Sequence, residues 1–226
     1  MDKIKNKFLE IGNATGTDKV SFHNYHEIYP QYIEKFYNSK GGMLEIGILE
    51  GSSLNLWLEL FPKMHIYGLD INPNKEINKN ERYTIIKGDQ SVQADLVNAI
   101  NKIEHPLWFI NDDGSHIPEH QLLTFNTMFP KLEVGGVYII EDVETSYWTK
   151  GGLYGYETRY GLGHPKNIIE IFKKSIDGVN HRYVLNPPTQ EVMYQKQFHS
   201  ITFAQNCIII VKGNENNKSY WFNEHL

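Results

Sequence analysis

Hydrophobic residues occur mainly in short runs, and amphipathic segments separate these runs along most of the chain. The runs cover residues 43–46, 65–69, 83–86, 107–110 and 136–140, and each is followed by glycine or by a polar or acidic residue. Segments with helical spacing lie at about 54–60, 95–103 and 119–129. This alternation predicts parallel strands joined by helices. Two last runs, near 200–203 and 207–212, are separated by a short turn and predict an antiparallel pair.

Two segments depart from this alternation. Residues 1–40 are expected to form a helical cap on one edge of the sheet, with a helix at about 28–37. Alternatively, Lys19, His23 and Tyr25 fold over a ligand, and both can be true. Residues 143–165 are rich in glycine and aromatic residues and are too long for an ordinary connection, so a lid or an acceptor-binding loop is expected. The same tyrosines could equally form an oligomer contact, and a homo-oligomer is expected. A helix at 166–176 should precede the last two strands.

The turn after the first strand has the features of a ligand-binding turn. Gly47 and Gly51 allow tight bends and close approach of a ligand to the backbone, and Ser52 or Ser53 can cap the following helix. The spacing differs from G-x-G-x-x-G, so the turn suits a smaller adenosine-bearing ligand better than a dinucleotide.

Acidic and amide side chains follow the next two strands. Asp70 comes about twenty residues after the glycine turn, where a carboxylate typically binds a ribose diol, or it could cap the turn at Asn72. Asp89 and Gln90 follow the third strand and could bind adenine edges or cap a helix. All three should lie at the carboxyl edge of the sheet.

The fourth and fifth strands end in a concentration of negative charge. Asp112, Asp113 and His116 follow the fourth strand, and Glu141 and Asp142 follow the fifth. If the two strands are neighbours, this much like charge requires a bound cation or shifted pKa values. An all-oxygen ligand set favours Mg²⁺ or Mn²⁺ over zinc. His116, with an ordinary pKa of about 6.5, could accept a proton near neutral pH.

Net charge and hydropathy argue against nucleic-acid and membrane partners. The net charge of −5 and the absence of a basic stripe argue against a nucleic-acid partner. Cys207 is the one cysteine, so no internal disulfide can form. No apolar run has membrane-spanning length and the first residues lack a secretory h-region, so a cytoplasmic protein with no membrane partner is expected.

Together these motifs resemble the class I S-adenosylmethionine-dependent methyltransferases. The segments Gly16-Thr17-Asp18-Lys19, Asp112 to His116 and Glu141-Asp142 are more specifically similar to the metal-dependent macrolide-sugar O-methyltransferase and cephalosporin-hydroxylase-like group, which includes enzymes for bacterial surface-polysaccharide sugars. The resemblance implies an α/β Rossmann-like fold, with a mostly parallel seven-stranded sheet, an antiparallel closing strand and an N-terminal helical addition. It implies one domain, 1–226, with the cap at 1–40, a cofactor-binding half at 41–142, the loop at 143–165 and the closing helix and strands at 166–226.

The resemblance also implies roles for individual residues. It makes Asp113, Glu141 and Asp142 the metal ligands and His116, with Asp113, the catalytic pair. The residues expected to bind S-adenosylmethionine lie at successive strand ends: Glu45, Gly47, Gly51, Ser52, Asp70, Asp89, Gln90 and Asp112.

The expected function is O-methylation of a sugar hydroxyl with S-adenosylmethionine and Mg²⁺ or Mn²⁺. The acceptor is expected to be a nucleotide-linked or surface-polysaccharide sugar such as a heptose. Two alternatives remain: methylation of a catechol-like small molecule, and a non-catalytic cofactor-binding module.

Overall fold

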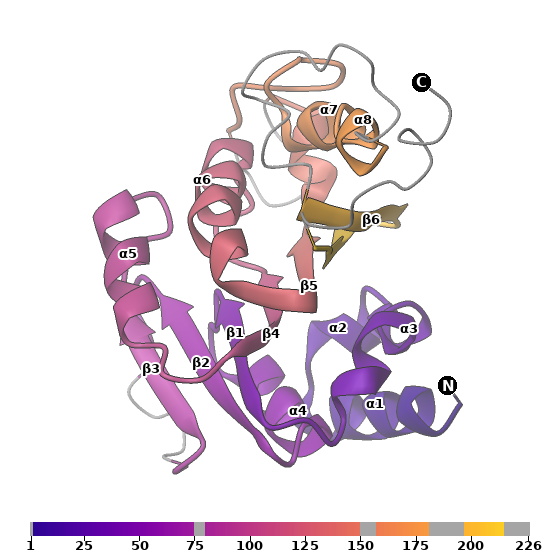
Figure 1. Ribbon diagram of the computed structural model, residues 1–226, viewed down its shortest axis with the longest axis vertical. Helices are drawn as coiled ribbons and strands as arrows, with labels where there is room; N and C mark the ends of the chain where they lie inside the picture. Colours follow the sequence, from indigo (N-terminus) through magenta and orange to yellow (C-terminus); the bar gives the residue numbers. More distant parts are fainter. Residues whose placement is uncertain (1, 75–79, 150–156, 181–196, 215–226) are drawn as a thin grey trace, which may run out of the picture.

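The fold is one seven-stranded sheet with helices on both faces (Figure 1). The computed structural model describes residues 2–74, 80–149, 157–180 and 197–214. The strands are β1 (Gly41–Ile46), β2 (Met64–Asp70), β3 (Tyr83–Lys87), β4 (Leu107–Asp112), β5 (Leu132–Glu141), β6 (Phe198–Ala204) and β7 (Cys207–Lys212). Their order across the sheet is β3-β2-β1-β4-β5-β7-β6.

The pairing confirms the predicted fold class. Strands β1 to β5 pair in parallel, and β7 pairs antiparallel with both β5 and β6. Because consecutive parallel strands run outward from β1 on one side and from β4 on the other, the strand order reverses between them. Ligands of open α/β sheets bind at the carboxyl ends of the strands beside such a reversal.

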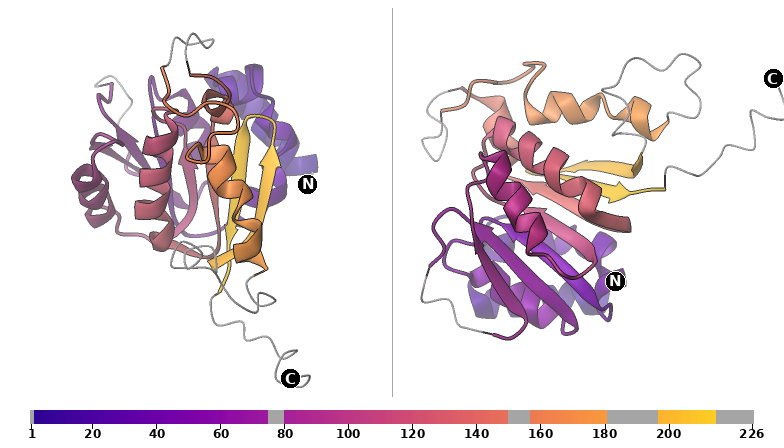
Figure 2. Two further views of the ribbon diagram at one scale, coloured as in Figure 1. Left: turned by 90° about the horizontal axis from the view of Figure 1, so that it is seen from above. Right: turned by 60° about the vertical axis from the view of Figure 1, so that its left-hand side comes forward.

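Helices from the two halves of the chain cover opposite faces of the sheet (Figure 2). The first face carries α1 (Asp2–Thr15), α2 (Asp18–Ser21), η1 (Tyr25–Glu27), α3 (Pro30–Ile33), η2 (Glu34–Phe36) and α4 (Ser52–Leu60). The second face carries α5 (Gln93–Asn101), α6 (Pro118–Met128), η3 (Phe129–Lys131), α7 (Ile168–Lys173) and α8 (Ile176–Val179). The short helix η4 (Val143–Tyr147) follows β5.

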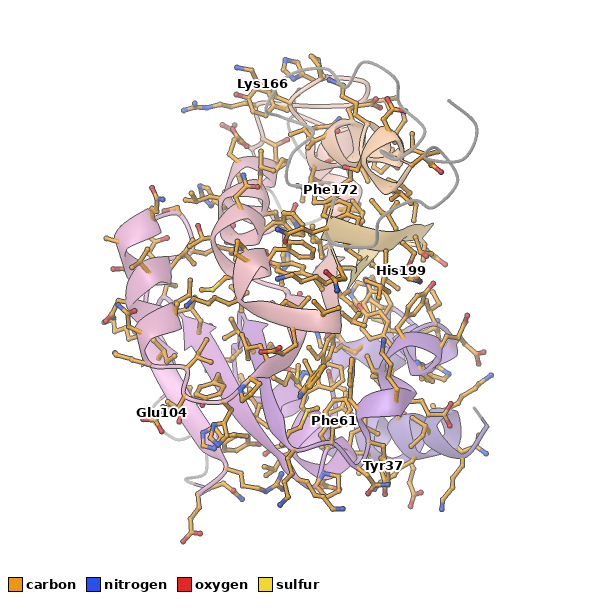
Figure 3. All side chains as sticks on the ribbon, viewed as in Figure 1. Tyr37, Phe61, Glu104, Lys166, Phe172 and His199 are labelled. Carbon is orange, nitrogen blue, oxygen red and sulfur yellow. The ribbon has the colours of Figure 1, made fainter. Side chains whose placement is uncertain are left out.

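Each face has its own hydrophobic core, because every strand residue points to one face or the other. Phe61 belongs to the core beneath α1 and α4, and Phe172 belongs to the core beneath α5, α6 and α7. Figure 3 shows these two side chains in separate parts of the molecule. The two layers hold the sheet firmly, so its carboxyl edge is a rigid base for the side chains that follow each strand.

Three local predictions were wrong. The helix expected at 28–37 is divided into two short helices, α3 and η2, and begins only at Pro30, because proline can begin a helix but cannot continue one. The helix expected at 166–176 is divided into α7 and α8. Helix α4 is capped by Gly51 without a side-chain bond, rather than by Ser52 or Ser53.

Some expectations fall on residues that the structure does not describe. They concern part of the loop predicted at 143–165, namely residues 150–156, and the chain from residue 215 onward. Among the described residues, no helix is both long and apolar enough to span a membrane.

Candidate functional site

The turns after β1 and β4 touch each other at the carboxyl edge of the sheet. Gly47 has a φ of +81°, and a Cβ atom placed there would lie 2.0 Å from the carbonyl oxygen of Asp113. The backbone of Asp113 also donates a hydrogen bond to Ile46 O at 2.9 Å. Glycine at position 47 is therefore required by this close approach as well as by the left-handed backbone.

Asp70, at the end of β2, shapes the glycine turn. Its Oδ2 accepts hydrogen bonds from the backbone N–H groups of Ile48 and Leu49 at 3.0 and 3.3 Å. Its Oδ1 accepts one from Asn72 N at 2.7 Å, as the capping alternative predicted. Asp70 thus lies next to the glycine turn, as a ribose-binding residue should. In this structure its carboxylate accepts hydrogen bonds from three backbone N–H groups.

Gln90 and Asp112 connect the end of β3 to the end of β4. Gln90 donates to Asp112 Oδ1 at 2.6 Å and accepts from Ser115 N at 2.7 Å. Tyr138 also donates to the Asp112 carboxylate, which is fully buried. Burial raises the pKa of Asp112 to about 7. Gln90 and Asp112 therefore connect the ends of β3 and β4 through buried hydrogen bonds. Asp89 forms a local turn, because its carboxylate accepts hydrogen bonds from Ser91 N and Oγ, each at 2.7 Å.

Glu45 faces the opposite side of the sheet, beneath α4. Ser53 Oγ donates to it at 2.8 Å and Trp57 Nε1 at 3.0 Å. Burial raises its pKa to about 7. Glu45 is fully buried, so its carboxylate contacts protein groups and not solvent.

A lysine from the N-terminal segment lies at the centre of the acidic cluster. Lys19 Nζ is 2.6 Å from Asp113 Oδ2, 2.9 Å from Glu141 Oε2 and 3.6 Å from Glu45 Oε1. Tyr29 donates a further hydrogen bond to Glu141 Oε1 at 2.8 Å. Lys19 thus reaches the acidic edge of the sheet from the N-terminal helical layer, and its folding over a ligand stays a prediction.

The outer part of the cluster consists of Asp113, His116 and Asp142. His116 Nε2 is 3.3 Å from Asp113 Oδ1, and His116 Nδ1 is 3.4 Å from Asp142 Oδ2. One ligand atom from each of the three residues lies within 4.8 Å of the others. The two carboxylates of this group fit a divalent cation that prefers oxygen ligands, whereas His116 offers a nitrogen atom. Glu141, the third predicted ligand, is bonded instead to Lys19 and Tyr29.

The pKa values of the three carboxylates Asp113, Glu141 and Asp142 shift in different directions. Burial raises the pKa of Glu141 to about 8 and that of Asp142 to about 7, with Asp113 adding repulsion to both. Burial acts in the same direction on Asp113, but Lys19 and His116 outweigh it and hold the pKa of Asp113 below its usual range. Burial lowers the pKa of His116, yet Asp113 and Asp142 raise it to about 9.

That value changes the expectation for His116. The sequence-based expectation used an ordinary pKa of about 6.5 for histidine. With Asp113 and Asp142 on either side of it, the imidazole is protonated at neutral pH. Any role of His116 as a base therefore requires that the charge of Asp113 and Asp142 be offset.

Strained backbone marks the same residues. His116 and Asp142 both have left-handed backbone, with φ of 57° and 51°. Such residues are uncommon outside glycine and tend to occur at functional sites. Thr145 Oγ1 donates to His116 O, and Asn206 Nδ2 donates to Asp142 Oδ1 at 2.7 Å. The first bond holds the backbone of His116, and the second holds the side chain of Asp142.

A cavity of about 420 Å³ opens beside Asp142. Asn206, which bonds Asp142, and His23, whose Nε2 is 3.6 Å from Asp142 Oδ1, line the cavity. Its walls come from the residues after α2, from η4, from α7 and from the ends of β6 and β7 with the turn between them: Phe22, His23, Val143, Glu144, Tyr147, Ile169, Phe203, Ala204, Gln205, Asn206 and Cys207. The volume is in the range of small-molecule sites.

Several of these contacts could not be found from sequence. Tyr29 and Asn206 lie 112 and 64 residues from their partners Glu141 and Asp142, and each belongs to an ordinary helix or turn pattern. The motif Gly16-Thr17-Asp18-Lys19 was the one available signal, and it pointed to Lys19.

Sequence comparison finds several relatives among enzymes that methylate sugars. The chain is 34% identical over 177 residues to 8-demethyl-8-alpha-L-rhamnosyl tetracenomycin-C 2'-O-methyltransferase of Streptomyces olivaceus, which covers 74% of this chain and 44% of the relative. It is 36% identical over 169 residues to demethylmacrocin O-methyltransferase of Streptomyces fradiae, which covers 72% of this chain and 41% of the relative. No protein-family model matches the chain.

Structural comparison finds the same group. The MycE methyltransferase from the mycinamycin biosynthetic pathway, solved in complex with Mg, SAH and mycinamycin VI, has a TM-score of 0.81 and 26% identity, over 95% of this chain and 56% of that chain. The chain thus spans about half the length of the relatives that it matches.

Proposed function

Because the chain belongs to the class I S-adenosylmethionine-dependent methyltransferases, in the group of metal-dependent sugar O-methyltransferases, we propose that it transfers a methyl group to a sugar hydroxyl. The observation that carries the proposal is the convergence of Asp113, His116 and Asp142 beside the glycine turn of β1. The cofactor would supply an activated methyl group, and a divalent cation would supply positive charge for the acceptor hydroxyl.

We assign the cofactor to the edge formed by the turns after β1, β2 and β3. Gly47 and Gly51 keep the first turn free of side chains, and Asp70 holds the N–H groups of Ile48 and Leu49 in position. Asp89 and Gln90 close the edge next to Asp112. Glu45 accepts hydrogen bonds from Ser53 and Trp57 of α4, and Ser52 is the first residue of that helix.

We assign the divalent cation to the outward-facing carboxylates. Asp113 Oδ1 and Asp142 Oδ2 lie on either side of His116, and the side chain of Asp113 is partly accessible whereas that of Asp142 is buried. Glu141 would complete the predicted set of ligands by giving up its bonds to Lys19. His116 would then face the acceptor hydroxyl with its carboxylate partners neutralised, as the role of base requires.

The cavity beside Asp142 is the proposed acceptor site. Phe22, Tyr147 and Phe203 are 62%, 51% and 44% exposed, and all three line this cavity. Exposed aromatic faces suit sugar rings. Glu144 lines the same cavity, and Asp142 lies behind His23 and Asn206, so negative charge disfavours a phosphorylated acceptor there.

The acceptor class follows the relatives more closely than the sequence-based expectation. The names of the two sequence relatives and of MycE refer to a rhamnosyl tetracenomycin, to demethylmacrocin and to the mycinamycin biosynthetic pathway, and none refers to a surface polysaccharide. We therefore propose a glycoside as the first acceptor to test, with nucleotide-linked and polysaccharide sugars, heptose included, as comparisons. A homo-oligomer stays a prediction.

The test is methyl transfer from labelled S-adenosylmethionine to a panel of glycosides, nucleotide sugars and polysaccharide fragments. We expect transfer that a chelator abolishes and that Mg²⁺ or Mn²⁺ restores, because the carboxylates need a cation to act on a hydroxyl. Calorimetry with S-adenosylhomocysteine measures cofactor binding separately. Absence of that binding would reject the methyltransferase proposal, and full transfer in chelator with negligible metal content would reject the cation.

A further inference from the structure

Lys19 is a charged side chain with no exposed surface. Its Nζ donates to Asp113 Oδ2 at 2.6 Å and to Glu141 Oε1 and Oε2 at 3.0 and 2.9 Å. Glu45 adds a third carboxylate at 3.6 Å. These carboxylates come from the ends of β1, β4 and β5, so one ammonium group joins three strand ends.

The local structure around Lys19 directs this side chain into the sheet edge. Thr17 caps α2 by accepting from Lys19 N, and its carbonyl accepts from Val20 N and Ser21 N. Val20 is buried in the core beneath α1. The backbone of Lys19 is therefore held at both sides, and its side chain extends toward Glu141.

The contacts of Lys19 divide the cluster into two parts. Both oxygens of Glu141 accept from Lys19, and Oε1 also accepts from Tyr29. Asp113 is shared, with Oδ2 on Lys19 and Oδ1 toward His116. A cation that used Glu141 would thus need oxygen atoms that Lys19 already holds.

We propose that Lys19 is a built-in counter-ion that competes with the divalent cation for Glu141 and Asp113. In the cation-free protein its ammonium keeps the three carboxylates together, which like charge alone would separate. In the cation-loaded protein Glu141 exchanges Lys19 for the metal. This inference rests on the proposed cation site and adds to it a positioning residue from the N-terminal segment.

The experiment is a calorimetric titration of the full chain with Mg²⁺. Lys19→Met removes the competing charge and should bind Mg²⁺ at least on the order of tenfold more tightly than the natural sequence. Equal or weaker binding by this variant overturns the proposal. Both titrations use the same buffer and ionic strength, since salt screens charge.

Two variants separate competition from other effects. Lys212 is a buried lysine whose Nζ donates to the carbonyl oxygens of Phe129, Pro130 and Leu132, and Phe129 and Leu132 belong to the core beneath α5, α6 and α7. Lys212→Met should leave Mg²⁺ affinity unchanged. Tyr29→Phe removes an uncharged donor to Glu141 and should change Mg²⁺ affinity less than Lys19→Met does.

Loss of Lys19 could unfold the cation-free protein, so stability is measured as well. In that case Mg²⁺ should restore the folded state and raise Tm more for Lys19→Met than for the natural sequence, because the metal replaces the missing counter-ion. A variant that stays unfolded at saturating Mg²⁺ overturns the proposal. Binding of Mg²⁺ by neither protein overturns the cation site itself, which separates that failure from failure of the competition.

Discussion

His116 shows how far neighbours can change one residue. Its left-handed backbone directs the imidazole between Asp113 and Asp142, and these two carboxylates raise its pKa to about 9. A base must be unprotonated, so the rate should rise with pH through the pKa of this group. Offsetting the carboxylate charge would lower that pKa toward neutrality.

His116→Ala should lower kcat on the order of 10²–10⁴-fold, which is the usual contribution of a general base. S-adenosylhomocysteine and Mg²⁺ should still bind, because Gly47, Asp113 and Asp142 remain. Steady-state rates between pH 5 and 10 would measure the loss, and the acidic limb of the profile should disappear.

A neighbouring histidine is the control. His120 Nδ1 is 3.0 Å from Ser115 Oγ and lies outside the carboxylate cluster. His120→Ala should keep kcat close to that of the natural sequence. A His116→Ala variant with an unchanged rate across pH would remove His116 from the reaction.

At the scale of elements, the site depends on turns more than on the strands themselves. Gly47 lets the β1 turn pass against the β4 turn, and Gly114 does the same against Gln90, where a Cβ would lie 2.2 Å from Oε1. Each glycine is thus explained by a contact with another segment. Helix α2 contributes similarly, since its four residues carry Lys19 to the sheet edge.

Gly47→Ala should lower the free energy of unfolding by at least about 2 kcal/mol, because it adds backbone strain and a clash with Asp113 O. The same shift should weaken S-adenosylhomocysteine binding. Denaturant unfolding and calorimetry measure the two effects.

Gly135→Ala is the control that separates the backbone strain of a positive φ from the clash with Asp113 O. Gly135 has a φ of +84°, and a Cβ there would meet nothing within 4 Å. Its substitution should cost only the conformational strain, about 1–2 kcal/mol, with unchanged ligand binding. Equal losses in both variants would show that the contact with Asp113 adds nothing.

At the scale of the whole molecule, each face of the sheet is stabilised by its own hydrophobic core. The N-terminal segment packs on the sheet through Phe8, which is fully buried and lies edge-on to Trp57 and Tyr29, with ring centroids 5.7 and 6.2 Å apart. Lys19 and Tyr29 reach the acidic cluster from this segment. Packing on this face therefore decides whether the cluster is complete.

Phe8→Ala should lower the free energy of unfolding by about 3–5 kcal/mol. Amide hydrogen exchange should rise most in α1 and α2, because the lost contacts hold these helices on the sheet. Mass spectrometry of exchanged peptides, together with denaturant unfolding, would measure this pattern.

Phe172→Ala is the matched variant on the other face. Phe172 is 2% exposed and packs edge-on to Phe125 at 4.9 Å. A similar loss of stability is expected, with faster exchange in α6 and α7 and little change in α1. Uniform acceleration in both variants would contradict two separately stabilised faces.

The sequence by itself determined the fold class and the edge at which the polar residues gather. Apolar runs that alternate with helical segments form a parallel sheet, and residues directly after such strands must lie at one edge. Asp113 and Asp142 could be placed together in this way because each directly follows a strand.

Only the tertiary structure decided which of these groups contact each other. Lys19 and Glu141 are 122 residues apart, and the pattern around Lys19 is that of any short capped helix. The pKa of His116 likewise depends on distances of 3.3 and 3.4 Å to two carboxylates. Local spacing fixes the period and direction of side chains, whereas such contacts arise when separate elements pack, so they can be known only from the folded chain.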